Sequence, residues 1–300
     1  MPFACDIRKL DEGRFYSLFC EDFFSTLSRD QKIELLQEAH NREAARMGIK
    51  PVPIKGENMR SGDLGGYFPG YNYIGLNLEL LDSKRTVFET TGVSLLSTVL
   101  HEGRHAFQTA MLQHPEKMDK RTFFRWAMAE AKYFITDSVH GKDVMNKSWA
   151  LYAMQPIETD ARRYERRRIE QISEIVAKVK GEPDDYFLEQ IDQNLNADKY
   201  AIEFMSEYWT KEELLAKEEE VRIACDSKKF RDRFPNIPTD LVIHYFYDAL
   251  LAVDEARKGT KPDQIIVEMD MHADAEQGKL NGFVDEWNRN PDRPGYSFRV

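Results

Sequence analysis

Two histidines one helical turn apart are the strongest chemical signal in this chain. His101 and His105 flank Glu102 in an H-E-x-x-H pattern. On a helix this spacing places both imidazoles on one face, where they can bind one Zn²⁺ ion. A catalytic zinc site keeps one position open for a water molecule, and the glutamate between the histidines is suited to take that water's proton. The pattern therefore predicts a zinc-activated hydrolase with Glu102 as general base.

The alternative is a chance match on an exposed helix, because a chain with 7 histidines in 300 residues can produce this spacing without any metal. The surroundings favour the metal site. Apolar residues recur around the motif at helical spacing, which is typical of a buried helix, and buried histidine and glutamate side chains need partners. These apolar residues are Leu95, Leu96, Val99, Leu100, Phe107 and Ala110.

A third protein ligand must come from elsewhere in the chain. Gln108 and Met111 stand where the metzincin arrangement has a glycine and a third histidine, so that class is excluded. The remaining option is a carboxylate from a later helix. The segment 155–165 supplies two candidates, Glu158 and Asp160, in the first turn of a helix expected to start at Pro156. Without the upstream motif, both would be interpreted as an acidic first turn that favours the helix dipole.

At this point the chain resembles the gluzincin group of zincin metallopeptidases, in which a glutamate on a helix after H-E-x-x-H completes the zinc site. Glu158 and Ala161 resemble the E-x-x-A portion of the E-x-x-A-[D/N] pattern. The resemblance implies Glu158 as the third ligand, with Asp160 as the alternative. It departs at Arg162, where these families often carry an Asp or Asn that orients a ligand histidine. Because a cation cannot accept that histidine's N–H, the orienting role must lie elsewhere, and Asp160 is the nearest candidate.

The resemblance extends loosely from about Ser28 to Glu165 and implies a protein or peptide substrate. In such enzymes the strand before the motif helix pairs with an extended peptide. The matching residues here are Tyr73, Ile74, Gly75, Leu76 and Asn77. Peptide hydrolysis also calls for a second oxyanion donor besides the metal. Tyr164 is our first candidate, and the spacing does not separate it from Tyr152, Arg162 and His140.

The helices and strands expected around these residues indicate a predominantly helical α+β fold. A capping box at Ser28 begins a helix that ends near Gly48, and two or three short strands follow before the motif helix. From about Val93 onward the chain is nearly all helical. We expect a small, mostly antiparallel sheet packed on the motif helix, with additional C-terminal helices. The expected divisions are an N-terminal segment (1–27), a metallopeptidase-like domain (28–180) and a helical extension packed on it (181–300).

Composition excludes several other function classes. The net charge of −10 disfavours nucleic acid and anionic membranes as partners. Charged residues occur so early in the sequence that they interrupt any apolar region of a signal peptide. No apolar run approaches the length of a membrane span. Three widely spaced cysteines indicate a reducing compartment. We therefore expect a soluble, cytoplasmic protein, although an effector exported without a leader would have the same features.

Two rival functions stay open alongside a zinc metallopeptidase. One is a catalytically inactive zinc-binding or peptide-binding module with a metallopeptidase fold, and the other is a zinc hydrolase acting on a non-peptide amide. A purely structural zinc site has no use for a general base and closes its fourth position with a protein ligand. The presence of Glu102 therefore favours the enzyme.

Overall fold

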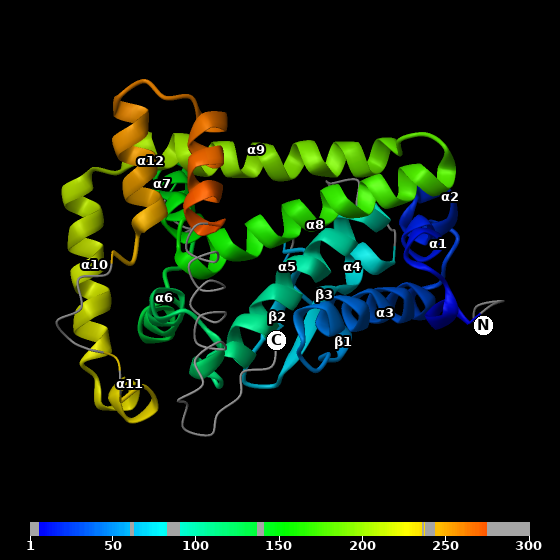
Figure 1. The fold of residues 1–300 in the computed structure, drawn as a ribbon, viewed down its shortest axis with the longest axis horizontal. Coiled ribbons are helices and arrows are strands. Elements are labelled where there is room, and N and C mark those ends of the chain that lie inside the picture. The colour runs from blue at the N-terminus through cyan, green and yellow to red at the C-terminus, as the bar shows by residue number, and fades with distance from the viewer. Residues whose placement is uncertain are drawn as a thin grey trace, which may run out of the picture. The chain divides into compact units, whose positions relative to one another are not determined.

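Helices dominate the computed structural model, which describes residues 6–60, 63–82, 91–136, 141–235, 237 and 244–274 (Figure 1). Together with a small sheet they confirm the predominantly helical α+β class. The elements in chain order are α1 (Glu12–Tyr16), α2 (Glu21–Phe24), α3 (Arg29–Met47), β1 (Ile54–Glu57), β2 (Gly65–Phe68), β3 (Tyr73–Asn77), α4 (Leu78–Leu81), α5 (Gly92–Met111), α6 (Lys120–Ala131), α7 (Lys142–Ala153), α8 (Pro156–Lys180), α9 (Asp185–Tyr208), α10 (Lys211–Cys225), α11 (Lys228–Arg233) and α12 (Tyr247–Arg257). Residues 262–274 are also helical.

The sheet of the described residues has the strand order β1-β3-β2. β1 pairs with β3 in parallel and β2 pairs with β3 antiparallel, so the sheet is mixed rather than mostly antiparallel. Ile74 and Leu76 of β3 are fully buried. Because β3 has a partner on both sides, it has no exposed edge to offer a substrate. A peptide strand therefore cannot pair with the backbone of Tyr73–Asn77, while a substrate-binding role for these residues stays a prediction. Among the described strands, β1 and β2 are the two outer ones.

The predicted helix at Ser28 is present as α3. The Ser28 side chain accepts a hydrogen bond from the Gln31 backbone, and the Gln31 side chain accepts one from the Ser28 backbone N–H, which completes the capping box. At the other end Gly48 has a φ of 71°, the left-handed conformation that glycine adopts without strain.

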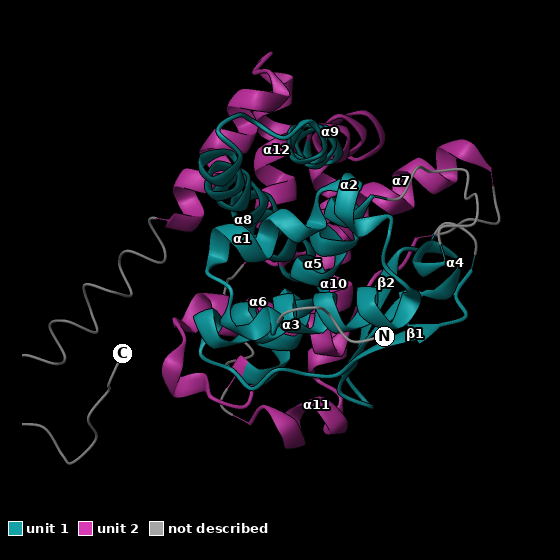
Figure 2. Ribbon diagram, turned by 90° about the vertical axis from the view of Figure 1, so that its right-hand side faces the viewer, with its two compact units in different colours: residues 1–110, 157–198 teal, residues 111–156, 199–300 magenta. Residues whose placement is uncertain are grey.

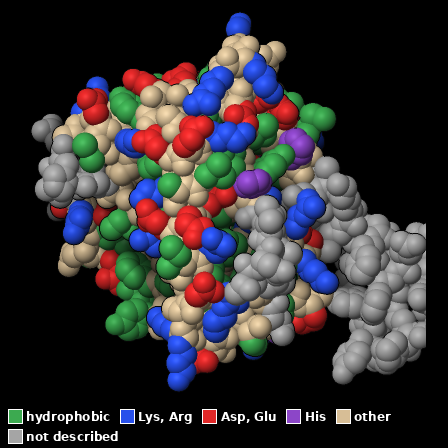
Figure 3. Space-filling model, turned by 90° about the vertical axis from the view of Figure 1, so that its left-hand side faces the viewer, with side chains coloured by type: hydrophobic (Ala, Val, Ile, Leu, Met, Phe, Trp, Pro, Cys, Tyr) green, Lys and Arg blue, Asp and Glu red, His purple; other side chains and the backbone are tan. Residues whose placement is uncertain are grey.

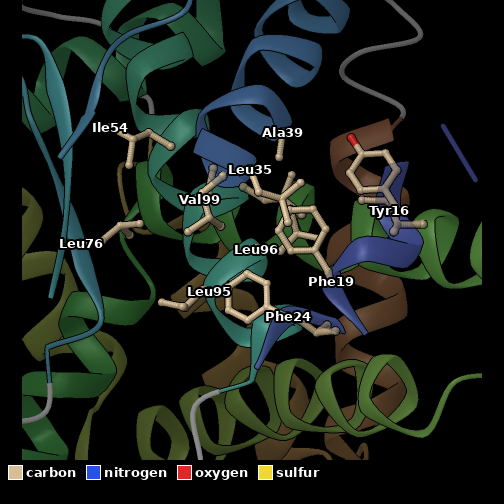
Figure 4. Packing of buried hydrophobic residues seen from close by; sticks show 14 of the residues in the cluster. Tyr16, Phe19, Phe24, Leu35, Ala39, Ile54, Leu76, Leu95, Leu96 and Val99 are labelled. Carbon is tan, nitrogen blue, oxygen red and sulfur yellow. The ribbon is translucent and has the colours of Figure 1, made fainter. Parts of the chain in front are cut away.

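Two compact units divide the chain, and each draws on two separate segments (Figure 2). Unit 1 comprises residues 1–110 and 157–198 and contains the sheet, α3 and nearly all of α5 and α8. In its core the apolar face of α5, with Leu96 and Val99, packs between the sheet residue Leu76 and the α3 residue Leu35 (Figure 4). Burying such side chains stabilises the fold by roughly 1.5–3 kcal/mol each. This packing fixes which face of α5 points away from the core.

Unit 2 comprises residues 111–156 and 199–300, and the regular secondary structure of its described residues is all helical. Within it, α10 contacts both α6 and α12. The Trp209 indole donates a hydrogen bond to the Lys147 backbone carbonyl (2.9 Å), and the Gln155 side chain pairs with both backbone groups of Phe134. The division into 1–27, 28–180 and 181–300 stays a prediction.

The surface of the described residues carries both signs of charge. Acidic and basic side chains lie intermixed over the face drawn in Figure 3. None of the described helices combines the length and apolar character that crossing a bilayer requires.

Candidate metal centre

The motif helix α5 presents His101 and His105 side by side. Their Nε2 atoms lie 3.2 Å apart, and the rings meet edge to face. Each side chain is about 15% exposed, which leaves it open to the site while its helix is anchored in the core. The one-turn spacing of the sequence motif produces this arrangement because both residues lie on the same face of the helix.

Glu158 reaches the same point from α8. It lies in the first turn of that helix, after Pro156, and its side chain is only 1% exposed. One carboxylate oxygen lies 3.3 Å from Nε2 of His101, and the other lies 3.4 Å from Nε2 of His105. The structure therefore brings together the three residues that the sequence singled out as metal ligands.

These distances fit the ligand shell of one metal ion. Bonds of about 2.0–2.1 Å to a tetrahedral ion place its ligand atoms about 3.3–3.4 Å apart. The separations between the two imidazoles and the carboxylate fall at 3.2 to 3.4 Å. A carboxylate as buried as Glu158 also needs positive charge beside it. The His101, His105 and Glu158 group could hold a metal ion.

Both imidazoles are oriented by hydrogen bonds on their far side. Nδ1 of His101 lies 3.0 Å from Glu165, whose other oxygen accepts a hydrogen bond from the Ser97 hydroxyl. Nδ1 of His105 lies 2.8 Å from the amide oxygen of Gln108. With Nδ1 committed in this way, Nε2 of each ring is turned toward Glu158. Outer partners of this kind fix the tautomer and orientation of ligand histidines.

Asp160, the alternative ligand, is engaged elsewhere. Arg104 donates two hydrogen bonds to its carboxylate, at 2.7 and 2.9 Å, and the Gln108 amide donates a third at 2.8 Å. Burial opposes ionisation of Asp160, but the charge of Arg104 outweighs it and lowers the pKa. Asp160 thus supports Gln108, and it contacts a ligand histidine only through that residue. The direct orienting roles belong to Glu165 and Gln108, which the sequence analysis did not identify.

The protonation of the two histidines and Glu158 is strongly coupled. Burial alone would lower the pKa of His101, but hydrogen bonds to Glu158 and Glu165 raise it well above its usual value. Burial would raise the pKa of Glu158, yet the His105 and His101 imidazoles hold it well below its usual value. Protons therefore compete for the positions that a metal ion would take, and metal affinity is expected to rise with pH.

Glu102 lies in a cleft beside this cluster. Its Oε2 accepts a hydrogen bond from the Tyr67 backbone N–H (2.7 Å), so the outer strand β2 holds the Glu102 carboxylate in place. The cleft has a volume of about 220 Å³. Gly65 lets β2 run this close, because a Cβ there would lie only 2.8 Å from Cγ2 of Thr98. The lining residues are Leu64, Gly65, Thr98, His101, Glu102, Arg162, Glu165, Asn194 and Ala197.

Three of the four candidates for the oxyanion donor lie among the described residues, each in different surroundings. The Tyr164 hydroxyl donates to the buried Glu43 carboxylate (2.7 Å), and Tyr164 is not among the residues that line the cleft. Arg162 does line it. Tyr152 belongs to unit 2, where its ring contacts Tyr133 edge to face. His140 lies outside the described residues.

Comparisons with protein-family models, with curated proteins and with solved structures found no match to this chain. Its function is therefore inferred from the chemistry of the site.

Proposed function

We propose that this protein is a zinc-dependent hydrolase that cleaves peptide bonds, with Glu102 as the general base. The observation that carries the proposal is the spacing of the two Nε2 atoms and the Glu158 carboxylate at 3.2 to 3.4 Å, next to a cleft that contains Glu102. A structural zinc site would need a fourth protein ligand, and the described residues supply three at this position.

The donor set supports zinc as the metal. Two imidazoles and one carboxylate are the protein ligands of many catalytic zinc sites, and the same set also binds Fe(II) in oxygenases. Glu102 favours the hydrolytic choice, because hydrolysis needs a base beside the metal. When bound, zinc would supply a polarised water molecule and polarise the substrate carbonyl.

The chain's own residues supply the proton transfers. Glu102 accepts a proton from the attacking water and then delivers it to the leaving nitrogen of the cleaved bond. The Tyr67 N–H holds the Glu102 carboxylate at the cleft. Glu165 and Gln108 keep the imidazoles from rotating, so the two Nε2 atoms stay directed at the metal position.

An extended peptide would pair with the outer edge of β2. The Tyr67 N–H points to Glu102 and therefore away from β3, whereas the carbonyl of Leu64 accepts from Asn77 of β3 (3.1 Å). Because backbone groups of successive residues alternate sides in an antiparallel strand, Gly65 and Tyr67 present their carbonyls to the outside. A substrate strand added there would run along the cleft lined by Gly65 and Glu102.

Metal analysis and peptide cleavage test the proposal together. The full chain is measured for bound zinc and iron, and for cleavage of a peptide library, as wild type, Glu102→Gln and the control Glu116→Gln, an exposed residue of unit 2. We expect zinc in all three proteins and cleavage lost only in Glu102→Gln, by about 10²-fold or more. Absence of metal from the folded protein, or equal cleavage by Glu102→Gln, would contradict it.

A further inference from the structure

Arg162 brings a positive charge to the wall of the cleft. Among the lining residues it is the one arginine or lysine, and His101 is the other lining residue that can carry positive charge. It follows Glu158 by one turn on α8, which corresponds to about 6 Å along the helix axis. Since successive residues of an extended peptide are about 3.3–3.6 Å apart, a group bound by Arg162 would lie within about two residues of the cleaved bond.

The Arg162 guanidinium is held in position before any substrate binds. Its Nε donates to Asp198 (2.8 Å), and the other oxygen of Asp198 lies 3.2 Å from Nε of Arg166. All three side chains are at most 14% exposed. Asp198 thus contacts both arginines. A fixed planar guanidinium loses little rotamer entropy on binding and suits a second carboxylate.

The other charged residues of the cleft are committed to the metal centre. Glu102 accepts from the Tyr67 N–H, and Glu165 pairs with His101 and Ser97. The rest of the lining is neutral: Leu64, Gly65, Thr98, Asn194 and Ala197. At about 220 Å³ the cleft is below the roughly 300–1,000 Å³ of pockets that hold drug-sized ligands, so it suits a single side chain or a chain terminus.

We propose that the cleft binds a substrate carboxylate through Arg162, carried either by an acidic side chain or by the C-terminus next to the cleaved bond. The carboxylate's role as part of a substrate rests on the proposed peptidase function. The binding of a carboxylate to Arg162 can be measured without turnover. The shared chemistry is a carboxylate facing a guanidinium, and the two sources differ only in where the carboxylate sits on the peptide.

The test measures binding of small probes to the metal-free full chain by titration calorimetry. N-acetyl-aspartate amide represents an acidic side chain, N-acetyl-alanine represents a C-terminus, and N-acetyl-asparagine amide is the neutral control. We expect at least one acid probe to bind, and Arg162→Gln to weaken that binding about 10- to 100-fold. Arg162→Lys should retain part of it, because the charge stays and the planar fork is lost.

Arg166→Gln is the matched control, because Arg166 bonds the same Asp198 but does not line the cleft. It should bind the acid probe like the wild type, with folding of each variant verified by thermal unfolding. Equal binding of acid and neutral probes by the wild type, no binding of either acid, or equal losses in Arg162→Gln and Arg166→Gln would overturn the proposal.

Kinetics provide the second readout. If the chain cleaves peptides, Arg162→Gln should lower kcat/KM for acid-bearing peptides and leave their amide counterparts unchanged. A uniform fall in kcat for both would mean that Arg162 stabilises the reacting carbonyl oxygen instead, and would contradict carboxylate recognition. If no peptide is cleaved by any variant, the proposed function fails, while the probe titrations still decide whether Arg162 binds carboxylates.

Discussion

Glu165 lies 3.0 Å from Nδ1 of His101 and follows Glu158 by two turns of the same helix, α8. One helix therefore supplies both a candidate metal ligand and the group that orients another ligand. Any shift of α8 along its axis would move both contacts together. The metal centre is consequently sensitive to how α8 packs on α5.

Glu165→Gln should weaken metal binding about 10- to 100-fold while the protein stays folded, because the amide replaces a charged acceptor for the His101 N–H. Competition with a chelator of known affinity measures the change. Glu170→Gln, five residues further along α8, serves as the control variant and should match the wild type. Unchanged zinc affinity in Glu165→Gln would mean that the Glu165 contact does not act on the metal site.

Glu158→Gln and Asp160→Asn separate the two acidic candidates for the third ligand. The Glu158 variant should lose the metal, because its carboxylate faces both Nε2 atoms. The Asp160 variant should keep it with a fall in affinity of about tenfold or less, since Asp160 acts through Gln108. Metal content after dialysis gives the answer, and the reverse order of losses would assign the ligand to Asp160.

Tyr164→Phe should leave kcat nearly unchanged and destabilise the fold. The hydroxyl donates to the buried Glu43, which is 2% exposed and also accepts from Tyr16 and Arg168. Removing one donor from a buried carboxylate costs about 1–3 kcal/mol. Urea unfolding and peptide kinetics on the same variant test this together, and a large loss of kcat with unchanged stability would restore Tyr164 as a catalytic residue.

His40 should make stability depend on pH below neutrality. It is fully buried, its Nε2 accepts from the Val52 N–H (3.0 Å), and burial lowers its pKa to about 4. An unfolded histidine titrates near 6.5, so between about pH 6.5 and 4 the unfolded state binds the extra proton. The free energy of unfolding is therefore unaffected by the titration of His40 above about pH 6.5. It falls as the pH falls through this window, by a total of about 3 kcal/mol.

His40→Gln removes this titration while keeping an acceptor for the Val52 N–H. Urea unfolding at pH 7.5 and pH 5 should show the wild type losing about 2 kcal/mol more than the variant between the two conditions. The exposed His244 replaced by Gln should behave like the wild type. Identical pH dependence in the wild type and His40→Gln would mean that His40 is protonated in the folded state.

The parts of the site predictable from sequence are those set by spacing within one helix. The one-turn separation of His101 and His105 determines their common face, and Pro156 with Glu158 marks the start of α8. The sequence did not reveal the partners Glu165 and Gln108. Glu165 lies 64 residues from His101, so their contact depends on how α8 packs on α5. Gln108 lies 3 residues from His105, and that contact depends on the direction of the two side chains. A usable signal did exist for Glu165, since it lies two turns after Glu158 and thus near the same helical face.

The sheet shows a different limit. Aromatic and β-branched residues such as Tyr73 and Ile74 predict the strand β3, but the strand order depends on which distant strand lies beside it. β1 pairs in parallel with β3 from twenty residues upstream, and β2 begins with two glycines, a residue type that is depleted in strands. Glycine at Gly65 and Gly66 conceals strand character while serving close packing against α5 at Gly65.

The discontinuity of unit 1 has a consequence for how the candidate metal centre assembles during synthesis. His101 and His105 belong to its first segment and Glu158 to its second, with residues 111–156 between them. At roughly 5–20 residues per second, the ribosome completes Glu158 several seconds after His105. Through that interval the nascent chain holds two histidines without their carboxylate, so a competent site assembles only after translation has passed the start of α8.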